Sequence, residues 1–379
     1  MSNKYKDEYS SDFLKDCKGY TKLPDTLSKR DRIIAIGDVH GDLNLTVTNL
    51  LIANVIELTE KSSNTLEVKY EDNTKEYYKW IGGDTVVVQV GDQVDRCRPI
   101  GYGTVCVQDK EATIDDEHSD IKILDLFTEL NKLAKKKNGM VISLLGNHEL
   151  MNYQGNMNYV SYNGVHNDDF EGKNAKYKKN DKNDVSYYKD GVEGRKAAFN
   201  GLTAPENGER LNKKLACTRQ TAVIVGSFIF VHGGIVPELA KKFKISEVNN
   251  LIRKWLLKQL KDDDPDIETL INTPNQSPFW SRLFGYLPSG LSFTDRRCEK
   301  SLEPILKIWG ENRGGLKGMV IGHTPQIEKG INSTCDDKVW RVDIGASKAF
   351  DVFEKIKNSG RKPSVLEILD DGRKFNVLT

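Results

Sequence analysis

The sequence contains no long hydrophobic segment. No apolar run approaches the roughly 18–20 residues that a transmembrane helix needs, and residues 1–6 are polar where a signal peptide would begin to be apolar. We therefore expect an intracellular, cytoplasmic protein with no membrane partner.

The chain also has no excess charge of either sign. Its 56 Lys and Arg residues nearly balance 55 Asp and Glu residues, which gives a formal net charge of +1. Proteins that bind nucleic acid usually carry a clear basic excess, so we expect no nucleic-acid partner.

Cysteine is scarce, and no two cysteines form a Cys-x-x-Cys pair. In an intracellular chain we expect reduced thiols, with Cys97 close to a functional motif. The six cysteines are Cys17, Cys97, Cys106, Cys217, Cys298 and Cys335.

The 379 residues are enough for one large α/β domain with surface insertions. Residues 1–30 form a polar N-terminal extension that we expect on the surface, and residues 31–379 form the domain. Residues 59–82 alternate in hydrophobicity and predict an inserted hairpin. Residues 163–191 are rich in Lys, Asn and Asp and poor in aliphatics, so we expect a mobile insertion there.

Five short motifs follow apolar, strand-like runs along the chain. The run at residues 85–90 is rich in β-branched side chains and leads directly into Asp92. A carboxylate in that position lies in a loop at the edge of a sheet. The motifs are Gly37–Asp42, Gly91–Arg96, Gly146–Glu149, Val231–Gly234 and Gly322–Thr324.

Carboxylates, imidazoles and an amide at these strand ends predict a centre for two metal ions. Two cations about 3.5–4 Å apart bind ester oxygens and generate a hydroxide at neutral pH, which suits hydrolysis of a phosphate ester. Asp92 is predicted to bridge the two ions. We assign Asp38 and His40 to one metal, and Asn147, His232 and His323 to the other. Oxygen and nitrogen ligands without thiolate favour manganese, with iron or zinc as alternatives.

Three side chains near the ligands are candidates for proton transfer and phosphate binding. His148 follows the proposed ligand Asn147, and we predict that it is the general acid, oriented by Asp95. Arg96 is predicted to bind the phosphoryl oxygens, with Arg282 as a second arginine. The predicted mechanism is direct in-line attack by a metal-bridging hydroxide.

A lone histidine in a strand-rich protein is usually structural. Here four of the six histidines lie inside the five motifs, each after an apolar run. Chance is a poor explanation of that coincidence, so the motifs favour a functional site.

The order of these motifs over residues 32–324 resembles the calcineurin-like metallophosphoesterases, and among them the phosphoprotein phosphatase group. Three segments are most similar to the Shewanella-like phosphatases of that group: residues 146–152 with 159–161, residues 277–282, and residues 322–326 with 342–347. Cys97 is a departure, since the family usually has glycine after the motif arginine.

The resemblance implies a four-layered α/β fold, with a central β-sandwich flanked by helices, for residues 31–379. It implies phosphomonoesterase activity on phosphoproteins, with Ser/Thr or Tyr specificity left open, and the same ligand, acid and Arg96 assignments. It says nothing of the oligomeric state.

Two other functions stay open on the sequence alone. One is hydrolysis of a small molecule such as a dinucleoside polyphosphate, because related enzymes share the metal ligands. The other is a catalytically inactive scaffold, against which the complete set of predicted ligands argues.

Overall fold

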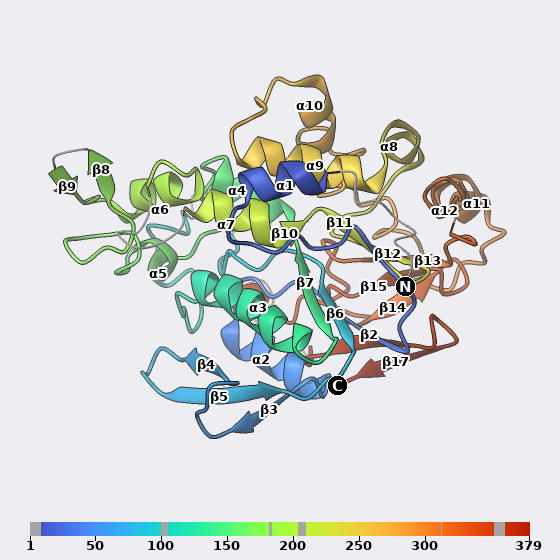
Figure 1. The fold of residues 1–379 in the computed structure, drawn as a ribbon, viewed down its shortest axis with the longest axis horizontal. Coiled ribbons are helices and arrows are strands. Elements are labelled where there is room, and N and C mark those ends of the chain that lie inside the picture. The colour runs from blue at the N-terminus through green and yellow to red at the C-terminus, as the bar shows by residue number, and fades with distance from the viewer. Residues whose placement is uncertain (1–8, 100–104, 182–183, 204–209, 312, 352–360) are drawn as a thin grey trace.

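Two six-stranded sheets form the centre of the molecule (Figure 1). The computed structural model describes residues 9–99, 105–181, 184–203, 210–311, 313–351 and 361–379. The first sheet has the order β10 (Arg219–Gln220), β7 (Met140–Leu144), β6 (Val86–Gln89), β2 (Arg32–Ile36), β16 (Val365–Leu369) and β17 (Lys374–Leu378). The second has the order β1 (Thr26–Leu27), β11 (Ala222–Val225), β12 (Phe228–Val231), β13 (Gly318–Ile321), β15 (Val339–Arg341) and β14 (Asn332–Thr334).

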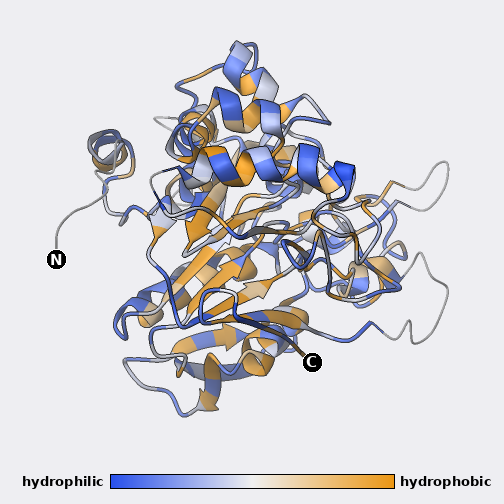
Figure 2. Ribbon diagram, turned by 90° about the vertical axis from the view of Figure 1, so that its right-hand side faces the viewer, coloured by the Kyte–Doolittle hydropathy of each residue, from blue (hydrophilic) through white to orange (hydrophobic). Residues whose placement is uncertain are grey.

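The two sheets pack face to face because their strands alternate between two apolar faces. In β2, Ile33 and Ala35 point into the core between the sheets, whereas Ile34 and Ile36 point into the core on the other side. Phe228 and Phe230 of β12 contribute to the same inner core. Figure 2 shows these strands as the most hydrophobic part of the ribbon. Strands β11 and β12 form a hairpin through their antiparallel pairing.

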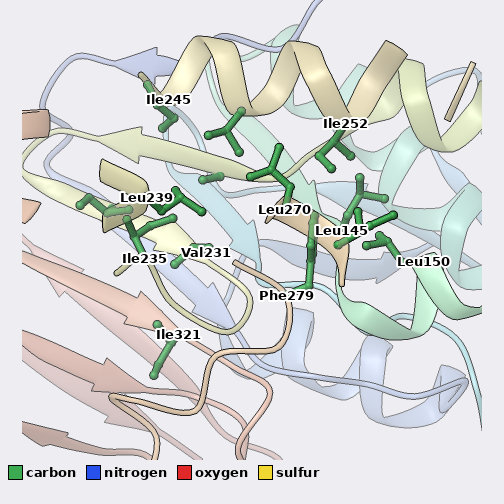
Figure 3. Close-up of a cluster of buried hydrophobic side chains, with 14 of the residues drawn as sticks. Leu145, Leu150, Val231, Ile235, Leu239, Ile245, Ile252, Leu270, Phe279 and Ile321 are labelled. Atoms are coloured by element: carbon green, nitrogen blue, oxygen red, sulfur yellow. The ribbon is translucent and has the colours of Figure 1, made fainter. Parts of the chain in front are cut away.

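Helices cover the outer face of each sheet. The long helix α3 (Asp120–Lys135) and α2 (Leu43–Ile52) bury their apolar faces against the first sheet. The second sheet is covered by α7 (Leu211–Thr218), α8 (Pro237–Lys242), α9 (Ile245–Leu256), α10 (Pro265–Ile271) and α12 (Glu303–Gly310). Ile252 and Leu270 of these helices lie near Val231 in the resulting core (Figure 3). The predicted four-layered α/β sandwich is confirmed.

Shorter helices lie at the sandwich edges and in the connections. They are α1 (Ser10–Asp16), α4 (Asn147–Tyr153), α5 (Tyr162–Val165), α6 (Gly191–Phe199), α11 (Arg296–Ser301) and the 3-10 helix η1 (Lys348–Phe350). Among them, α4 and η1 carry side chains of the candidate site described below.

The first insertion is a small antiparallel sheet of β3 (Ile56–Thr59), β5 (Lys75–Trp80) and β4 (Leu66–Lys69). The pairing of β4 with β5 is the hairpin that the alternating pattern predicts. It turns at Asn73, which has a positive φ of 67°, while the Asp72 side chain accepts the Thr74 N–H.

The second insertion is more closely packed than its composition suggests. It includes β8 (Lys179–Asp181) and β9 (Asp184–Ser186), and residues 182–183 of the predicted segment lie outside the described residues. Phe170 and Tyr177 are each 1% exposed and stack on each other within the main core. These two rings attach part of the predicted insertion to the core, a contact that the prediction did not include because it counted aliphatic residues and overlooked the aromatic ones.

The N-terminal extension is integrated into the fold from residue 9 onwards. Strand β1 pairs in parallel with β11 at the edge of the second sheet, and Phe13 of α1 is buried. Residues 1–8 lie outside the described residues.

The cysteines are paired, so the expectation of reduced thiols was wrong. Three disulfides join Cys17 to Cys217, Cys97 to Cys106, and Cys298 to Cys335. The prediction rested on the missing Cys-x-x-Cys spacing, which does not report on cysteines that the fold brings together. Disulfides persist mainly in oxidising compartments, so cysteine usage no longer supports the expected intracellular location.

None of the helices in the described part of the chain is both long enough and apolar enough to cross a membrane.

Candidate metal centre

The five sequence motifs meet at one edge of the sandwich. In the first sheet β2 is parallel to β6 and β6 is parallel to β7, so their carboxyl ends lie together. In the second sheet β12 is parallel to β13, which brings the ends that precede His232 and His323 together. Each motif follows one of these five strands, and every predicted metal ligand is buried.

Asp92 lies at the centre of this cluster. Its Oδ2 is 3.3 Å from Nε2 of His232 and 3.8 Å from Nε2 of both His40 and His148. Its Oδ1 accepts the backbone N–H of His148 at 3.0 Å. Burial raises the pKa of Asp92, but the surrounding histidines, led by His232, outweigh it and hold the pKa well below the usual range. A carboxylate in this position can bridge two cations.

Two groups of ligand atoms share Asp92. His40, Asp92 and His148 form one group, and Asp92, His232 and His323 form the other, with the ligand atoms in each lying within 4.8 Å of one another. The first group contains His148, whereas the sequence prediction placed Asp38 there. Oδ2 of Asp38 lies 4.0 Å from Nε2 of His40, so Asp38 faces the same position.

Oxygen atoms face both ring nitrogens of His232. Its Nδ1 lies 2.9 Å from the Val90 carbonyl, which can only accept, so Nδ1 is the donor. Its Nε2 then faces two oxygens, Oδ1 of Asn147 at 2.9 Å and Oδ2 of Asp92. Contact between Nε2 and these two oxygens is favourable only when Nε2 carries a proton or binds a metal ion that the oxygens also bind.

Two other ligand atoms are buried without a hydrogen-bond partner, namely Oδ1 of Asp38 and Nε2 of His323. Burial, together with the charges of Asp343 and Asp92, raises the pKa of Asp38 well above its usual range. Buried polar atoms normally have hydrogen-bond partners. Bound cations would supply partners for these two atoms and would relieve the repulsion among the neighbouring carboxylates. The residues therefore fit a dinuclear site with oxygen and nitrogen ligands.

The backbone at the site is held in an uncommon conformation. His40, Asp92, Asp95 and His323 have positive φ angles of 41°, 55°, 76° and 65°. Asp and His enter this region more readily than most non-glycine residues, and such conformations also recur at functional sites, where the surroundings hold them. Gly146 allows the close approach, because a Cβ there would lie 2.1 Å from Oδ1 of Asp92.

Glu149 supports the loop that carries Asp92. Its carboxylate accepts the backbone N–H groups of Asp92 at 3.0 Å, Gln93 at 2.7 Å and Gly146 at 2.6 Å. Burial and the charge of Asp92 raise the pKa of Glu149 to about 7. The side chain therefore fixes the relative position of two of the motifs.

His148 and Asp95 form the pair that the sequence predicts. Nδ1 of His148 lies 2.7 Å from Oδ2 of Asp95, and both side chains are buried. Asp95 is itself held by Asn152, which donates to its Oδ1 at 2.7 Å, and by Arg195 at 3.4 Å. This arrangement leaves Nε2 of His148 facing the metal centre.

The two arginines predicted from sequence have different surroundings. Arg96 is 2% exposed and donates from Nη1 to Asp42 and Ser347, each at 3.2 Å, with Glu117 3.8 Å from its Nη2. Arg282 is partly buried and donates to the His323 carbonyl at 2.7 Å. Both assignments as phosphate ligands stay predictions.

Sequence reasoning missed a second set of side chains over the histidines. Tyr159 and Phe350 lie edge-on to His148 and His40, with ring centroids 4.9 Å and 5.5 Å apart, and Trp280 lies 5.9 Å from His323. Arg98 lies against the Phe350 and Tyr159 rings. The sequence pointed to this set only through Arg98, a second arginine two residues after the Gly91–Arg96 motif.

Comparison with known proteins agrees with this geometry. The profile of the calcineurin-like phosphoesterase family matches residues 31–327. An uncharacterized protein of Acanthamoeba polyphaga mimivirus is 36% identical over 67% of this chain and 97% of its own. Shewanella-like protein phosphatase 2 of Arabidopsis thaliana is 26% identical over 92% of this chain and 78% of its own.

A solved structure has the same fold. The cold-active protein-tyrosine phosphatase of a psychrophilic Shewanella species aligns with a TM-score of 0.57 and 20% identity, covering 94% of this chain and 83% of that one. The chain belongs to the calcineurin-like phosphoesterase family, and it is accordingly a metal-dependent hydrolase of phosphoric esters.

Proposed function

We propose that the protein is a protein phosphatase that hydrolyses phosphomonoesters of phosphoproteins by direct transfer of the phosphoryl group to water. The observation that carries the proposal is the convergence of Asp92 with three histidine Nε2 atoms beside the buried His148–Asp95 pair. The names of the Arabidopsis relative and of the Shewanella-like protein phosphatase 1 of Plasmodium berghei support the substrate class.

Asp38, His40, Asp92, Asn147, His232 and His323 would hold the two metal ions. When bound, these ions supply charge neutralisation at the phosphoryl oxygens and activation of the attacking water. Manganese fits the oxygen and nitrogen donors, as do iron and zinc.

His148 supplies the proton in the proposed reaction. Asp95 accepts from Nδ1 of His148, which fixes the tautomer and compensates the positive charge of the imidazolium. The proton on Nε2 then passes to the leaving alkoxide or phenoxide as the ester P–O bond breaks. A buried pair keeps bulk water away from this proton transfer.

The test is an assay on matched phosphotyrosine and phosphothreonine peptides, with and without added manganese. We expect manganese-dependent release of phosphate, and the ratio between the peptides defines the specificity. Diadenosine tetraphosphate is assayed in parallel. A strong preference for that nucleotide would overturn the proposal in favour of small-molecule hydrolysis, and no turnover of any substrate would favour a scaffold.

A further inference from the structure

Arg98 is a buried arginine held between two aromatic rings. Its guanidinium carbon lies 4.5 Å from the Phe350 ring centroid and 5.6 Å from that of Tyr159, and the residue is 5% exposed. Its Nη1 donates to the carbonyls of Cys97 at 2.8 Å and Asp95 at 3.2 Å. Stacking and these two bonds fix the plane of the guanidinium.

The rings that hold Arg98 also contact the candidate site. Phe350 lies edge-on to His40 and Tyr159 edge-on to His148, while the His40 and His148 rings are 4.9 Å apart. Arg98 therefore lies beside the histidines that face Asp92. Burial lowers the pKa of Arg98, against the attraction of Asp92, Asp95 and Asp343. Burial, followed by the charge of Arg98, lowers the pKa of His40.

The charge of Arg98 is not paired by a carboxylate. Within the described residues no Asp or Glu oxygen lies within 4.0 Å of its nitrogens, and its Nε and Nη2 donate to no protein acceptor. Arg96 differs, because it bonds Asp42 at 3.2 Å and has Glu117 at 3.8 Å. A buried cation without a paired anion is costly, so the surroundings of Arg98 favour an anionic ligand.

We propose that Arg98 is a further arginine that binds the phosphoryl oxygens of the substrate. The inference rests on the proposed function, since it concerns the same site. The free edge of the guanidinium, formed by Nε and Nη2, presents the two parallel donors that match two phosphoryl oxygens. Arg96 ties the Asp92–Arg96 loop to Asp42 at the start of α2 and to Ser347 before η1.

The experiment measures binding of inorganic phosphate to the manganese-loaded protein by calorimetry, and kcat and KM on an aryl phosphate. Arg98→Met retains an apolar side chain between the rings and removes the buried charge, so it is the variant most suited to fold. Arg98→Lys restores a charge without the planar pair of donors. Arg373→Gln is the matched control, because Arg373 is exposed beyond Leu369, which pairs with Arg32 at the opposite end of β2 from the site.

We expect Arg98→Met to weaken phosphate binding by about 10- to 100-fold, as loss of charge-assisted hydrogen bonds implies, while metal content stays at the wild-type level. KM should rise more than kcat falls, and Arg98→Lys should recover part of the affinity.

The proposal is overturned if folded, metal-loaded Arg98→Met binds phosphate as the wild type does. Should Arg98→Met fail to fold, Arg98→Lys decides, because wild-type phosphate affinity and KM in that variant would contradict a need for paired donors. A wild-type protein without turnover, whose phosphate binding still depends on Arg98, would contradict the proposed function and leave this anion site standing.

Discussion

Asp92 combines the features that a bridging ligand requires, because it is buried, has its charge stabilised by neighbours and has its backbone fixed by Glu149. A carboxylate shared by two cations cannot be replaced by an amide, which has one oxygen and no charge. In the proposed dinuclear site this residue would therefore contribute to both metal positions.

Replacing Asp92 by Asn should remove both metal ions. The loss of affinity should exceed the roughly 10- to 100-fold that follows loss of an outer-shell partner. Metal content by mass spectrometry checks this, with Asp263→Asn at an exposed position as the control. Full occupancy of both ions in the Asp92 variant would show that the bridging assignment is wrong.

Replacing His148 by Asn should leave the metals bound and slow hydrolysis by about 10²–10⁴-fold, the usual share of general acid catalysis. The loss of rate should be larger for an ester with a poor leaving group, because departure of that group depends more on protonation by His148. His166→Asn is the matched control, since His166 is paired with Glu171 at 2.8 Å outside the site. An unchanged rate on the poor leaving group would remove His148 from this role.

Glu117 gives a pH dependence that does not involve the metal ligands. Burial and then the charge of Asp42 raise its pKa from 4.5 to about 7, although Arg96 opposes the shift. Below pH 4.5 Glu117 is protonated in both the folded and the unfolded protein, so its ionisation does not change the free energy of unfolding. It falls as the pH rises from 4.5 to 7, and the loss is complete above that.

Glu117→Gln should therefore increase stability at pH 8 by at most about 3 kcal/mol and leave it unchanged at pH 4, given about 1.4 kcal/mol per pKa unit. Denaturant unfolding of the metal-loaded proteins at both pH values measures this. Equal stability of variant and wild type at pH 8 would mean that Glu117 is ionised at little cost in the folded protein.

At the scale of single residues, the structure brings the predicted ligands together, while the roles predicted for them and for the arginines stay predictions. Asp38, His40 and Asp92 each lie within a few residues of the strand that positions them, so local pattern was informative. The direction of an arginine side chain depends on contacts from elsewhere. Arg96 turns to Ser347 and Arg98 to Phe350, both about 250 residues away in the chain, which no local pattern could predict.

Among the elements, strands and hairpins were predicted best because their apolar alternation is local. The N-terminal segment was predicted less well, because its attachment is made by β1 pairing with β11 and by the disulfide from Cys17 to Cys217. That disulfide fastens the segment preceding β1 to α7. Its two cysteines are separated by 200 residues, whereas Cys97 and Cys106 are separated by 9.

Loop closure predicts unequal effects of removing these two disulfides. Replacing Cys17 and Cys217 by Ser should lower the free energy of unfolding by about 2–3 kcal/mol more than the same change at Cys97 and Cys106, because the longer loop restricts the unfolded chain more. Denaturant unfolding of the two double variants provides the comparison, and each serves as the other's control. Equal losses would show that loop closure does not dominate.

The whole molecule places its candidate site between two sheets. Asp38 and Asp92 come from loops of the first sheet and Asn147 begins α4 after β7, while His232 and His323 come from loops of the second sheet. Bound metal ions would therefore join the two halves of the sandwich. Metal binding would then contribute to the stability of the entire fold, since a ligand that binds only the native state stabilises it.

Removing the metals with a chelator should lower the unfolding temperature. The loss in the free energy of unfolding should be about 3 kcal/mol if free metal was at 100 times its dissociation constant. Calorimetry before and after chelation measures it, and Asp92→Asn should show no further change with chelator. A wild-type protein whose unfolding temperature does not respond to chelation would contradict a metal link between the sheets.

The sequence by itself determined the strands, the edge at which their loops meet, and the identity of the ligands around Asp92. Each of these depends on a few neighbouring residues, on β-branched runs and on the side chains that follow them. The tertiary structure alone decided the pairing of the cysteines, the burial of Phe170 and Tyr177, and which arginine faces the histidines. These features depend on contacts between residues far apart in the chain, and the periodicity of a sequence carries no record of such contacts.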